Sequence, residues 1–561
     1  MDRPAKRTKL SSPGHNLPIV DTESLPTGDN GLASLHRSIT PPPQRRQKST
    51  STTAVSDEIK PIETPKQKHM PTIIYSSPIQ LTHIRDLPAS SGNNVDTIRL
   101  RDILGDPMIR ECWQFNFLID VDFLMNQFDE DVRDLVKVKV VHGSWKRDAP
   151  NRIRIDEQCS RYPNVESIVA YMPEPFGTHH SKMMILLRHD DLAQVIIHTA
   201  NMIPGDWANM TQAVWRSPLL PLLPNASTSE GTGGYGSGTR FKRDLLSYLN
   251  AYGRQKTGPL VKQLERFDFR AVRAALIASV PSKRKVESMD AKKETQWGWP
   301  ALKDIIRHIP LAPHSGTAHI VLQISSIASL GQTDKWLKDI FFDSLAQHSS
   351  PTPRPRFSII FPTPDEVRRS LNGYGSGGSI HMKTQSAPQQ KQLQYMHPYL
   401  RQWAGDSDFG LETSSTEAAS IPRREAGRRR AAPHIKTYIR FSDAAMGSID
   451  WAIVTSANLS TQAWGAAVNV QGEVRVCSWE IGVVVWPGLY VDGSPETKTA
   501  RMAPCFKQDR PAETKSGLDD VLVGFRMPYD VPLTPYGPRD EPWCATASHP
   551  EPDWLGQTWE G

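Results

Sequence analysis

Long hydrophobic runs are missing from this chain of 561 residues, and its apolar stretches, such as Val483-Val484-Val485, are only a few residues long. A membrane helix needs about 20 apolar residues, so we expect no transmembrane segment. The N-terminus carries no apolar signal-peptide core, which argues against secretion. Cysteine is scarce as well: five scattered residues form no CxxC pair, which argues against a disulfide framework and a cysteine-based zinc site.

Aromatic residues are absent before Tyr75, in a segment dominated by Ser, Thr, Pro and Lys. Such a segment cannot bury enough apolar surface to offset its chain entropy, so we expect residues 1–95 to form a disordered N-terminal tail. The basic cluster Lys6, Arg7 and Lys9 resembles a nuclear import signal, which predicts a nuclear protein, although a solvated charge run would look the same. The net charge of +6 is a weak indication of a polyanionic partner.

The rest of the chain mixes strand-like and helix-like patterns, which predicts an α/β fold. Strands are expected at residues 137–142, 195–197, 319–324 and 481–486, and helices at 299–308 and 334–346. The charged residues near 283–293 are expected to link two halves, 96–290 and 291–561. We expect surface insertions at 225–240 and 402–425, and irregular structure in the Pro- and Trp-rich chain after Asp492.

A repeated motif dominates the functional interpretation. The first copy has His180-Ser181-Lys182, then Thr199-Ala200-Asn201 and Trp207, and the second has His434-Ile435-Lys436, then Ser456-Ala457-Asn458 and Trp464. The Asn lies 21 residues after the first His and 24 after the second, and the Trp follows the Asn by six residues in both copies. One His-x-Lys means little, but two copies with matched downstream residues are a specific signal.

The residue types in these two copies suit phosphoryl chemistry. His and Lys two positions apart on a strand face the same side, and an Asn after the next strand can lie beside them. Two such clusters would share one pocket, with lysine and amide donors for the oxygens of a phosphoryl group. One imidazole could attack phosphorus while the other protonates the leaving oxygen and then activates water. The residues thus predict phosphodiester cleavage through a phosphohistidine without metal or cofactor, and leave open which histidine attacks.

The two motifs resemble those of the phospholipase D superfamily, whose members carry two His-Lys motifs in a duplicated fold. Most members have an Asp five residues after the Lys, where this chain has Leu187 and Phe441. Lack of this Asp is typical of the tyrosyl-DNA phosphodiesterase branch. The segments similar to signatures of that branch are Phe176–Met184, His198–Asn201, Pro433–Arg440 and Thr455–Gly465.

The resemblance implies two similar lobes, each a mixed β-sheet flanked by helices, with the active site at their pseudo-two-fold interface. It implies that His180 is the nucleophile and that His434 is the general acid and then the base. Gln212 and Glu480 fall where the branch keeps the groups that orient His434 and His180. The residues implied to hold the phosphate are Lys182, Lys436, Asn201 and Asn458. The expected DNA contacts are base stacking by Phe176, which could equally be a core residue, and hydroxyl contacts by Ser329, Ser379 and Ser460.

The activity implied by this resemblance is hydrolysis of 3′-phosphodiester adducts on DNA, chiefly the 3′-phosphotyrosyl bond left by stalled type IB topoisomerase, with a 3′-phosphate as product. The implied partners are DNA with 3′-blocked ends, single- or double-stranded, and a topoisomerase I-derived peptide as leaving group, with the chain acting as a monomer. Another phosphodiesterase of the superfamily, a phospholipase or a nuclease, is the alternative enzyme. A catalytically inactive DNA-binding scaffold would be expected to lose a His or Lys, and all four are present.

Overall fold

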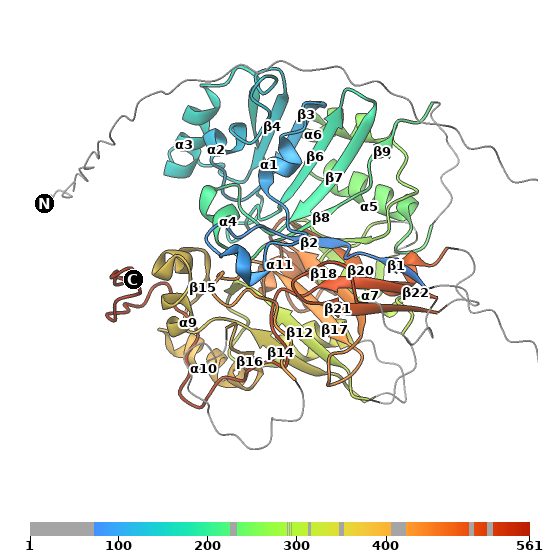
Figure 1. Ribbon diagram of the computed structural model, residues 1–561. Helices are drawn as coiled ribbons and strands as arrows, with labels where there is room; N and C mark the ends of the chain where they lie inside the picture. The colour runs from blue at the N-terminus through green and yellow to red at the C-terminus, as the bar shows by residue number, and fades with distance from the viewer. Residues whose placement is uncertain are drawn as a thin grey trace, which may run out of the picture. The chain divides into compact units, whose positions relative to one another are not determined.

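Two mixed β-sheets organise the part of the chain that the computed structural model describes (Figure 1). The described residues are 72–561 except 225–232, 289, 291, 293, 312–315, 347–352, 405–421, 493–498 and 513–519. All of them belong to one unit, Lys68–Gly561. The import-like cluster at Lys6, Arg7 and Lys9 therefore lies outside the described residues, as do most of the predicted insertions.

The first sheet has eight described strands in the order β2-β8-β7-β6-β3-β4-β5, with β9 beside β7. β3, β4 and β5 run parallel, and the remaining neighbours are antiparallel. The bounds are β2 (Ile79–Leu81), β3 (Ile109–Phe115), β4 (Lys137–His142), β5 (Val165–Val169), β6 (Met183–Arg188), β7 (Leu192–His198), β8 (Ala213–Arg216) and β9 (Leu220–Pro221).

The second sheet has ten described strands in the order β1-β22-β21-β18-β17-β12-β14-β16, and β20 joins β18 to β10. Its bounds are β1 (Ile73–Tyr75), β10 (Ala275–Ser279), β12 (His319–Gln323), β14 (Arg356–Ile360), β16 (Leu400–Arg401), β17 (Thr437–Phe441), β18 (Ile449–Thr455), β20 (Glu480–Val485), β21 (Ala500–Cys505) and β22 (Val521–Arg526). Two small ribbons pair β11 (Ser282–Lys285) with β19 (Glu473–Val476) and β13 (Ser326–Ile327) with β15 (His381–Met382).

A six-strand unit occurs once in each sheet. The orders β5-β4-β3-β6-β7-β8 and β16-β14-β12-β17-β18-β20 correspond strand by strand. Each unit has two parallel pairings followed by three antiparallel ones. Each His-x-Lys motif directly precedes a corresponding strand, β6 or β17. The expected duplicated α/β fold is confirmed.

Helices cover both faces of the first sheet. Alternate residues of β6 belong to two separate cores: Met183 lies in the core that includes Phe241 of α5, and Met184 lies in the core that includes Leu104 of α1. The helix bounds are α1 (Leu100–Leu104), α2 (Val121–Met125), α3 (Pro150–Cys159), α4 (Pro204–Ala208), α5 (Gly238–Asn250), α6 (Arg254–Leu264), α7 (Gly298–Arg307), α8 (Asp343–Ala346), α9 (Pro364–Arg368), α10 (Ala387–Met396) and α11 (Thr461–Trp464). The π-helix η3 (Trp336–Phe342) precedes α8, and the 3-10 helices are η1 (Ala89–Ser91), η2 (Val286–Ser288), η4 (Gly373–Ser379), η5 (His397–Tyr399) and η7 (Pro487–Tyr490).

The boundaries between the parts of the chain differ from those expected. Residues 72–95, placed by sequence in the disordered tail, contain β1 and β2, because short apolar stretches there complete the edges of both sheets. In Figure 1 the blue strand β1 runs beside the red strand β22. β10, expected in the first half, pairs with β20 of the second sheet. Part of the expected 225–240 insertion, from Gly238, begins α5.

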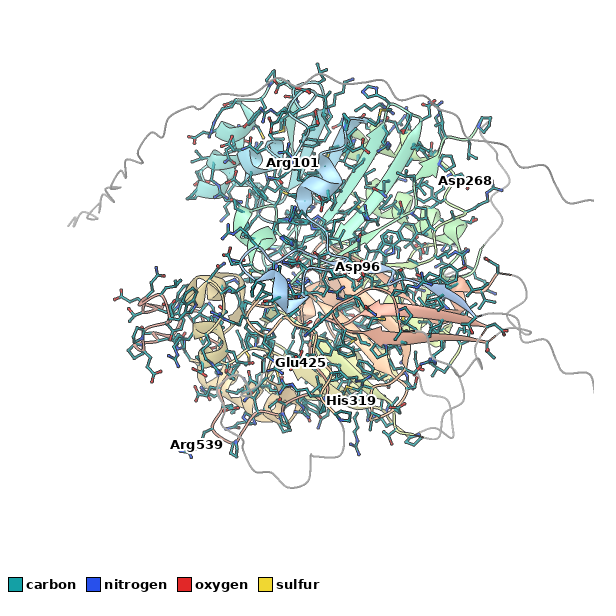
Figure 2. All side chains as sticks on the ribbon, in the orientation of Figure 1. Asp96, Arg101, Asp268, His319, Glu425 and Arg539 are labelled. Carbon is teal, nitrogen blue, oxygen red and sulfur yellow. The ribbon has the colours of Figure 1, made fainter. Side chains whose placement is uncertain are left out.

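The expectation of irregular structure after Asp492 is wrong for β21 and β22, which are interior strands of the second sheet. Proline content suggested a loop, but all six residues of β22 are buried. Pro504 fits in β21 because β21 pairs with β18 only at Met502 and Ile449. Side chains fill the space between the ribbons, and Asp96 lies where the two sheets meet (Figure 2). No helix among the described residues is long and apolar enough to span a membrane.

Candidate active site

A cleft of about 430 Å³ brings the two repeated motifs together. Residues of both halves line it, so the predicted pocket between the two copies of the fold exists. The predicted residues that line it are Phe176, His180, Asn201, Ser379, His434, Asn458, Ser460 and Glu480. Lys182, Lys436 and Gln212 are fully buried and contact or flank these residues.

Backbone hydrogen bonds hold each histidine to the opposite half. The His180 amide donates to Trp479 O at 2.9 Å, and Trp479 directly precedes Glu480. The His434 amide donates to Thr211 O at 3.1 Å, and Thr211 directly precedes Gln212. Glu480 begins β20 and Gln212 precedes β8, which are corresponding strands of the two copies. Each half therefore supplies the residue that orients the histidine of the other half.

The His180 ring is oriented by a carboxylate. Its Nδ1 lies 3.0 Å from Glu480 Oε2, and the Ser456 hydroxyl donates to the same oxygen. Because a carboxylate accepts, Nδ1 carries the proton and Nε2 keeps a lone pair. Burial lowers the pKa of His180 below its ordinary value, Lys182 and Lys436 add to this, and Glu480 opposes them. The neutral ring is thus held in the tautomer that a nucleophile needs.

The His434 ring has two different partners at Nδ1. Gln212 Nε2 lies 3.0 Å away, and Asp206 Oδ2 lies 3.1 Å away. Thr199 Oγ1 donates to Gln212 Oε1 at 2.8 Å, which turns the amide NH₂ toward His434 and Asp206. Burial lowers the pKa of His434 to about 3, and Lys436 acts in the same direction, while Asp206 opposes. The ring can accept from the amide when Nδ1 is unprotonated and donate to the carboxylate when Nδ1 is protonated.

Asp206 is a site residue that the sequence analysis missed. It is 1% exposed and also accepts from the Asn201 amide at 2.6 Å. Burial alone would raise the pKa of Asp206, but His434 and the Asn201 amide bring the net pKa below the ordinary value. Asp206 directly precedes Trp207, whereas Ala463 precedes Trp464 in the second copy. Asp206 is absent from the residues that the two sequence copies share, so only a comparison of the positions at which the copies differ could have indicated it.

The two lysines are buried beside the histidines. Lys182 Nζ donates to His180 O at 3.0 Å, and Lys436 Nζ donates to His434 O. Burial lowers the pKa of Lys182 to about 8, opposed by Glu480 and Asp206. Burial, and then Lys182, hold the pKa of Lys436 well below its ordinary value. Two crowded ammonium groups that have lost much of their hydration would be stabilised by an anion in the cleft.

The two asparagines have the same backbone contact with a tryptophan, but their side-chain oxygens have different surroundings. Trp207 Nε1 donates to Asn201 O and Trp464 Nε1 to Asn458 O, both at 3.0 Å, which explains the repeated spacing. Asn458 Oδ1 accepts the amides of Ser325 and Ser326, which leaves its NH₂ group available to the cleft. Asn201 Oδ1 is buried with no partner among the described residues.

Phe176 stands at the rim of the cleft with 78% of its surface exposed, so it is not a core residue. The next residue, Gly177, approaches the second half so closely that a Cβ would lie 2.1 Å from Cys477 O. Ser379 ends η4, and Ser460 caps α11 by accepting from Ala463 N. Ser329 is exposed and is not among the lining residues, although Ser325 and Ser326 of the preceding segment are.

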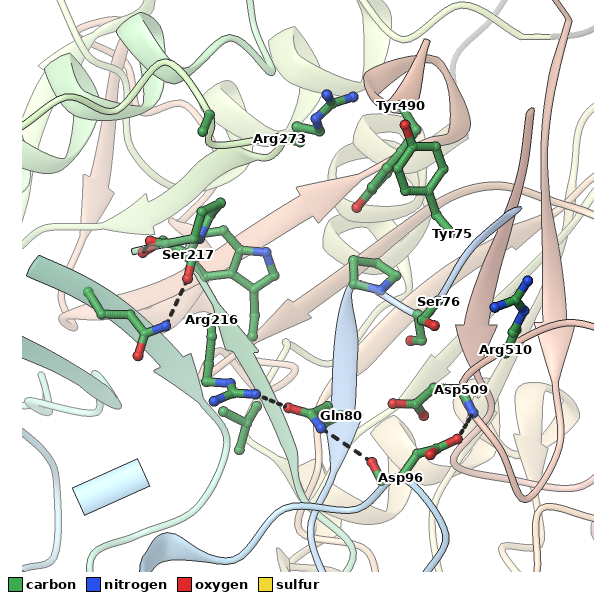
Figure 3. Close-up of a pocket in the computed structure, with 17 residues that line it drawn as sticks. Tyr75, Ser76, Gln80, Asp96, Arg216, Ser217, Arg273, Tyr490, Asp509 and Arg510 are labelled. Atoms are coloured by element: carbon green, nitrogen blue, oxygen red, sulfur yellow. Dashed lines mark hydrogen bonds between the residues drawn. The ribbon is translucent and has the colours of Figure 1, made fainter. Parts of the chain in front are cut away.

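A larger cavity of about 810 Å³ lies beside the segment that runs from β1, at the edge of the second sheet, to β2, at the edge of the first (Figure 3). Arg216 donates to Gln80 at 2.7 Å, and the Asp509 amide donates to Asp96 at 2.9 Å. None of the repeated His, Lys or Asn residues lines this cavity, so the phosphoryl chemistry belongs to the smaller cleft. Among the described residues, no three His, Cys, Asp or Glu side chains are placed to share a metal ion.

Comparisons with known proteins identify the family of this chain. A family model described as tyrosyl-DNA phosphodiesterase matches residues 78–537. The chain is 29% identical to the probable tyrosyl-DNA phosphodiesterase of Schizosaccharomyces pombe, over 87% of this chain and 96% of that protein. It is 31% identical to tyrosyl-DNA phosphodiesterase 1 of Drosophila melanogaster, over 80% of this chain and 70% of that protein. The crystal structure of the yeast tyrosyl-DNA phosphodiesterase shares the fold, with a TM-score of 0.57 and 21% identity, over 83% of this chain and 98% of that one.

Proposed function

Because the chain belongs to the tyrosyl-DNA phosphodiesterase family, we propose that it is a DNA repair hydrolase that cleaves 3′-phosphodiester adducts on DNA. Its chief substrate is the 3′-phosphotyrosyl bond left by a stalled type IB topoisomerase. The observation that carries this proposal is one cleft with two buried lysines and two histidines whose Nδ1 atoms have different partners. A phosphodiester in this cleft meets a fixed nucleophile on one side and a proton carrier on the other.

The first step forms a covalent intermediate. Nε2 of His180 attacks phosphorus, and the P–O bond to the tyrosyl oxygen breaks as the P–N bond forms. The leaving oxygen takes the proton from Nε2 of doubly protonated His434, whose Nδ1–H is held by Asp206. Lys182, Lys436, Asn201 and Asn458 donate to the phosphoryl oxygens, where negative charge develops. An anion in the cleft favours the protonated form of His434, which the empty site disfavours.

The second step releases the product. His434 is now neutral, with its proton on Nδ1 and a lone pair on Nε2. Nε2 takes a proton from water as the water oxygen attacks phosphorus, and the P–N bond to His180 breaks. The products are a 3′-phosphate, free His180 and protonated His434, which restores the starting state. The Asp206 carboxylate can accept the hydrogen bond from Nδ1–H of His434 through the whole cycle, which the NH₂ group of Gln212, a donor, cannot do.

DNA contacts at the rim complete the proposal. Phe176 stacks on a base beside the scissile bond, and Ser379 and Ser460 contact phosphates. Phe176→Ala should weaken single-stranded DNA binding by about 1–3 kcal/mol. Fluorescence anisotropy with a labelled oligonucleotide measures this. An unchanged affinity in a folded variant would contradict the stacking role.

The decisive experiment is a release assay. The purified chain should free tyrosine from a 3′-phosphotyrosyl oligonucleotide and leave a 3′-phosphate, in excess EDTA. Abolition of turnover by EDTA, with recovery on adding magnesium or zinc, would overturn the metal-independent mechanism. Release of choline from phosphatidylcholine, with no cleavage of the oligonucleotide, would favour the phospholipase alternative.

We further propose that the protein acts as a monomer in the nucleus. One chain supplies both motifs and both orienting residues, so the site needs no second copy. The basic cluster at Lys6, Arg7 and Lys9 supports nuclear import. Substituting all three residues with Ala should reduce nuclear accumulation and leave cleavage unchanged. Retained accumulation would assign import to another signal.

A further inference from the structure

Exposed aromatic residues continue outward from the cleft along one edge of the first sheet. Phe117 and Phe176 line the cleft, with 36% and 78% of their surfaces exposed. Beyond them, Tyr171 follows β5 and is 62% exposed, and Trp145 follows β4 and is 56% exposed. Large aromatic rings in water stabilise no core, so several of them at one edge indicate a binding surface.

The two loops that carry Trp145 and Tyr171 start side by side. β3, β4 and β5 are parallel, so their carboxyl ends meet at one edge. His142 pairs with Val169, and the Ala170 amide donates to His142 O at 2.8 Å. Trp145 and Tyr171 therefore leave the sheet from neighbouring positions.

Both loops are also anchored to the active site. Trp479 Nε1 donates to Tyr171 O at 3.0 Å, and Trp479 directly precedes Glu480. A Cβ on Gly143 would lie 2.5 Å from His179 Cβ, so the β4 loop passes directly against the residue before His180. The aromatic edge is thus continuous with the cleft and fixed relative to the reacting groups.

Positive charge accompanies these rings. Lys146 and Arg147 follow Trp145 and are exposed, and Lys146 Nζ lies 5.4 Å from the centre of the Trp145 ring. Neither forms an ion pair with a carboxylate of the described residues, although Asp148 follows in the same loop. Aromatic rings beside unneutralised cations are the combination that binds the bases and phosphates of single-stranded nucleic acid.

We propose that Trp145, Tyr171, Lys146 and Arg147 form an extended subsite for the adduct-bearing DNA strand, upstream of the scissile phosphate. Bases that follow the one at Phe176 stack on Tyr171 and Trp145, and Lys146 and Arg147 neutralise their phosphates. The inference rests on the proposed function, because it assumes that the strand enters the cleft past Phe176. It adds a substrate-length specificity that the cleft alone does not supply.

Cleavage of two 3′-phosphotyrosyl substrates, a mononucleotide that reaches only Phe176 and an oligonucleotide of about fifteen nucleotides, tests this subsite. Trp145→Ala and Tyr171→Ala should each lower kcat/KM for the long substrate by about 5- to 100-fold, as expected for loss of one stacked base. Both variants should cleave the short substrate at the wild-type rate. The double variant Lys146→Ala/Arg147→Ala should reduce the slope of log affinity against log salt by about 1.4 for single-stranded DNA.

Trp554→Ala is the matched control, because Trp554 is 55% exposed and its Nε1 donates to Ser370 O of the second half rather than to the β4 or β5 loop. It should leave both substrates unaffected. An equal effect of Trp145→Ala on both lengths, or none on the long one, overturns the subsite. Dependence on the length of the adduct peptide, with none on DNA length, assigns the edge to the peptide instead. If the wild-type chain cleaves neither substrate, the proposed function fails, and anisotropy with a free oligonucleotide still tests the subsite. Trp145→Leu or Tyr171→Leu replaces the corresponding Ala variant if that variant does not fold.

Discussion

His180 and His434 occupy the same position in the two copies of the fold, but their Nδ1 atoms meet different chemistry. His180 faces a carboxylate alone, Glu480, whereas His434 faces both the Gln212 amide and the Asp206 carboxylate. One ring is held in a single tautomer, and the other can keep or release a proton at Nε2 without turning. The two copies of the fold therefore place the histidines alike, and the side chains that differ between the copies give the two histidines different roles.

Removal of either imidazole should have the largest effect on turnover. General acid–base help is worth about 10²–10⁴-fold, and both His180→Ala and His434→Ala should lose at least that much turnover. They should differ in what accumulates. Tyrosine leaves with a pKa near 10, so His434→Ala can still complete the first step slowly and trap a covalent protein–DNA adduct, whereas His180→Ala cannot form one.

A denaturing gel with labelled oligonucleotide detects this adduct. Adduct from the His180 variant, and none from the His434 variant, would reverse the two roles. Absence of adduct from every variant, with sound wild-type turnover, would favour direct attack by water.

The Asp206 carboxylate should account for much of the difference between the rings. Asp206→Asn keeps the size and removes the charge, so turnover should fall about 10- to 100-fold, as for a hydrogen bond to a charged group. The trapped adduct should increase, because the base of the second step is weakened. Asp509→Asn is the control, since Asp509 is a buried carboxylate paired with Arg526 away from the cleft. Equal losses in both variants would indicate a structural effect.

The pH dependence should separate the lysine and histidine contributions. The pKa of Lys182 is lowered to about 8, so the free enzyme loses positive charge above this pH, and kcat/KM should fall by about tenfold per pH unit. The pKa of His180 is lowered from its ordinary value, so loss of the neutral nucleophile should begin only below about pH 6.5. Rates measured from about pH 5 to about pH 10 give both limbs. Lys182→Arg should shift the alkaline fall in kcat/KM to a higher pH. An unshifted fall would show that another group causes it.

The hydroxyls behind the orienting residues should give the smallest effects. Ser456 donates to the charged Glu480, and Thr199 donates to the neutral Gln212. Ser456→Ala should slow tyrosine release by about 10-fold and Thr199→Val by only about 3-fold, because hydrogen bonds to charged groups are stronger. Stopped-flow measurement of the first turnover resolves the two. Ser456→Thr and Thr199→Ser keep the hydroxyl and should recover most of the rate, and a larger effect at Thr199 would contradict this ranking.

The regular elements could be predicted where a clear pattern ran through them. The alternation in residues 137–142 predicted β4 to the residue, and the helix expected at 299–308 is α7, Gly298–Arg307. The helix expected at 334–346 is present as η3 followed by α8. β1, β21 and β22 were missed because their strand character depends on partners far away in sequence, such as the pairing of Ile73 with Val521.

Some residues of the candidate site could likewise be predicted from a sequence pattern, and others could not. The His, Lys and Asn residues repeat at matched spacing, so one sequence was enough to bring them together. Asp206 has no counterpart, and its contact with His434 joins residues of opposite halves. Gln212 and Glu480 each contact the histidine of the other half, and no local sequence pattern predicts such a tertiary contact. The family resemblance supplied those two residues, and the structure supplied Asp206.

Glu480 and Gln212 each orient the histidine of the other half, and this arrangement bears on how the two histidines could become different in evolution. In a symmetric dimer of single lobes, one gene encodes both sides, so any substitution beside one histidine appears beside the other as well. Both rings would then keep the same proton preference. Joining two lobes in one polypeptide removes this coupling, and each orienting position can mutate alone. A symmetric dimer of one gene product could not have Glu480 beside one histidine and Gln212 beside the other, and this divergence turns two equivalent histidines into an ordered pair.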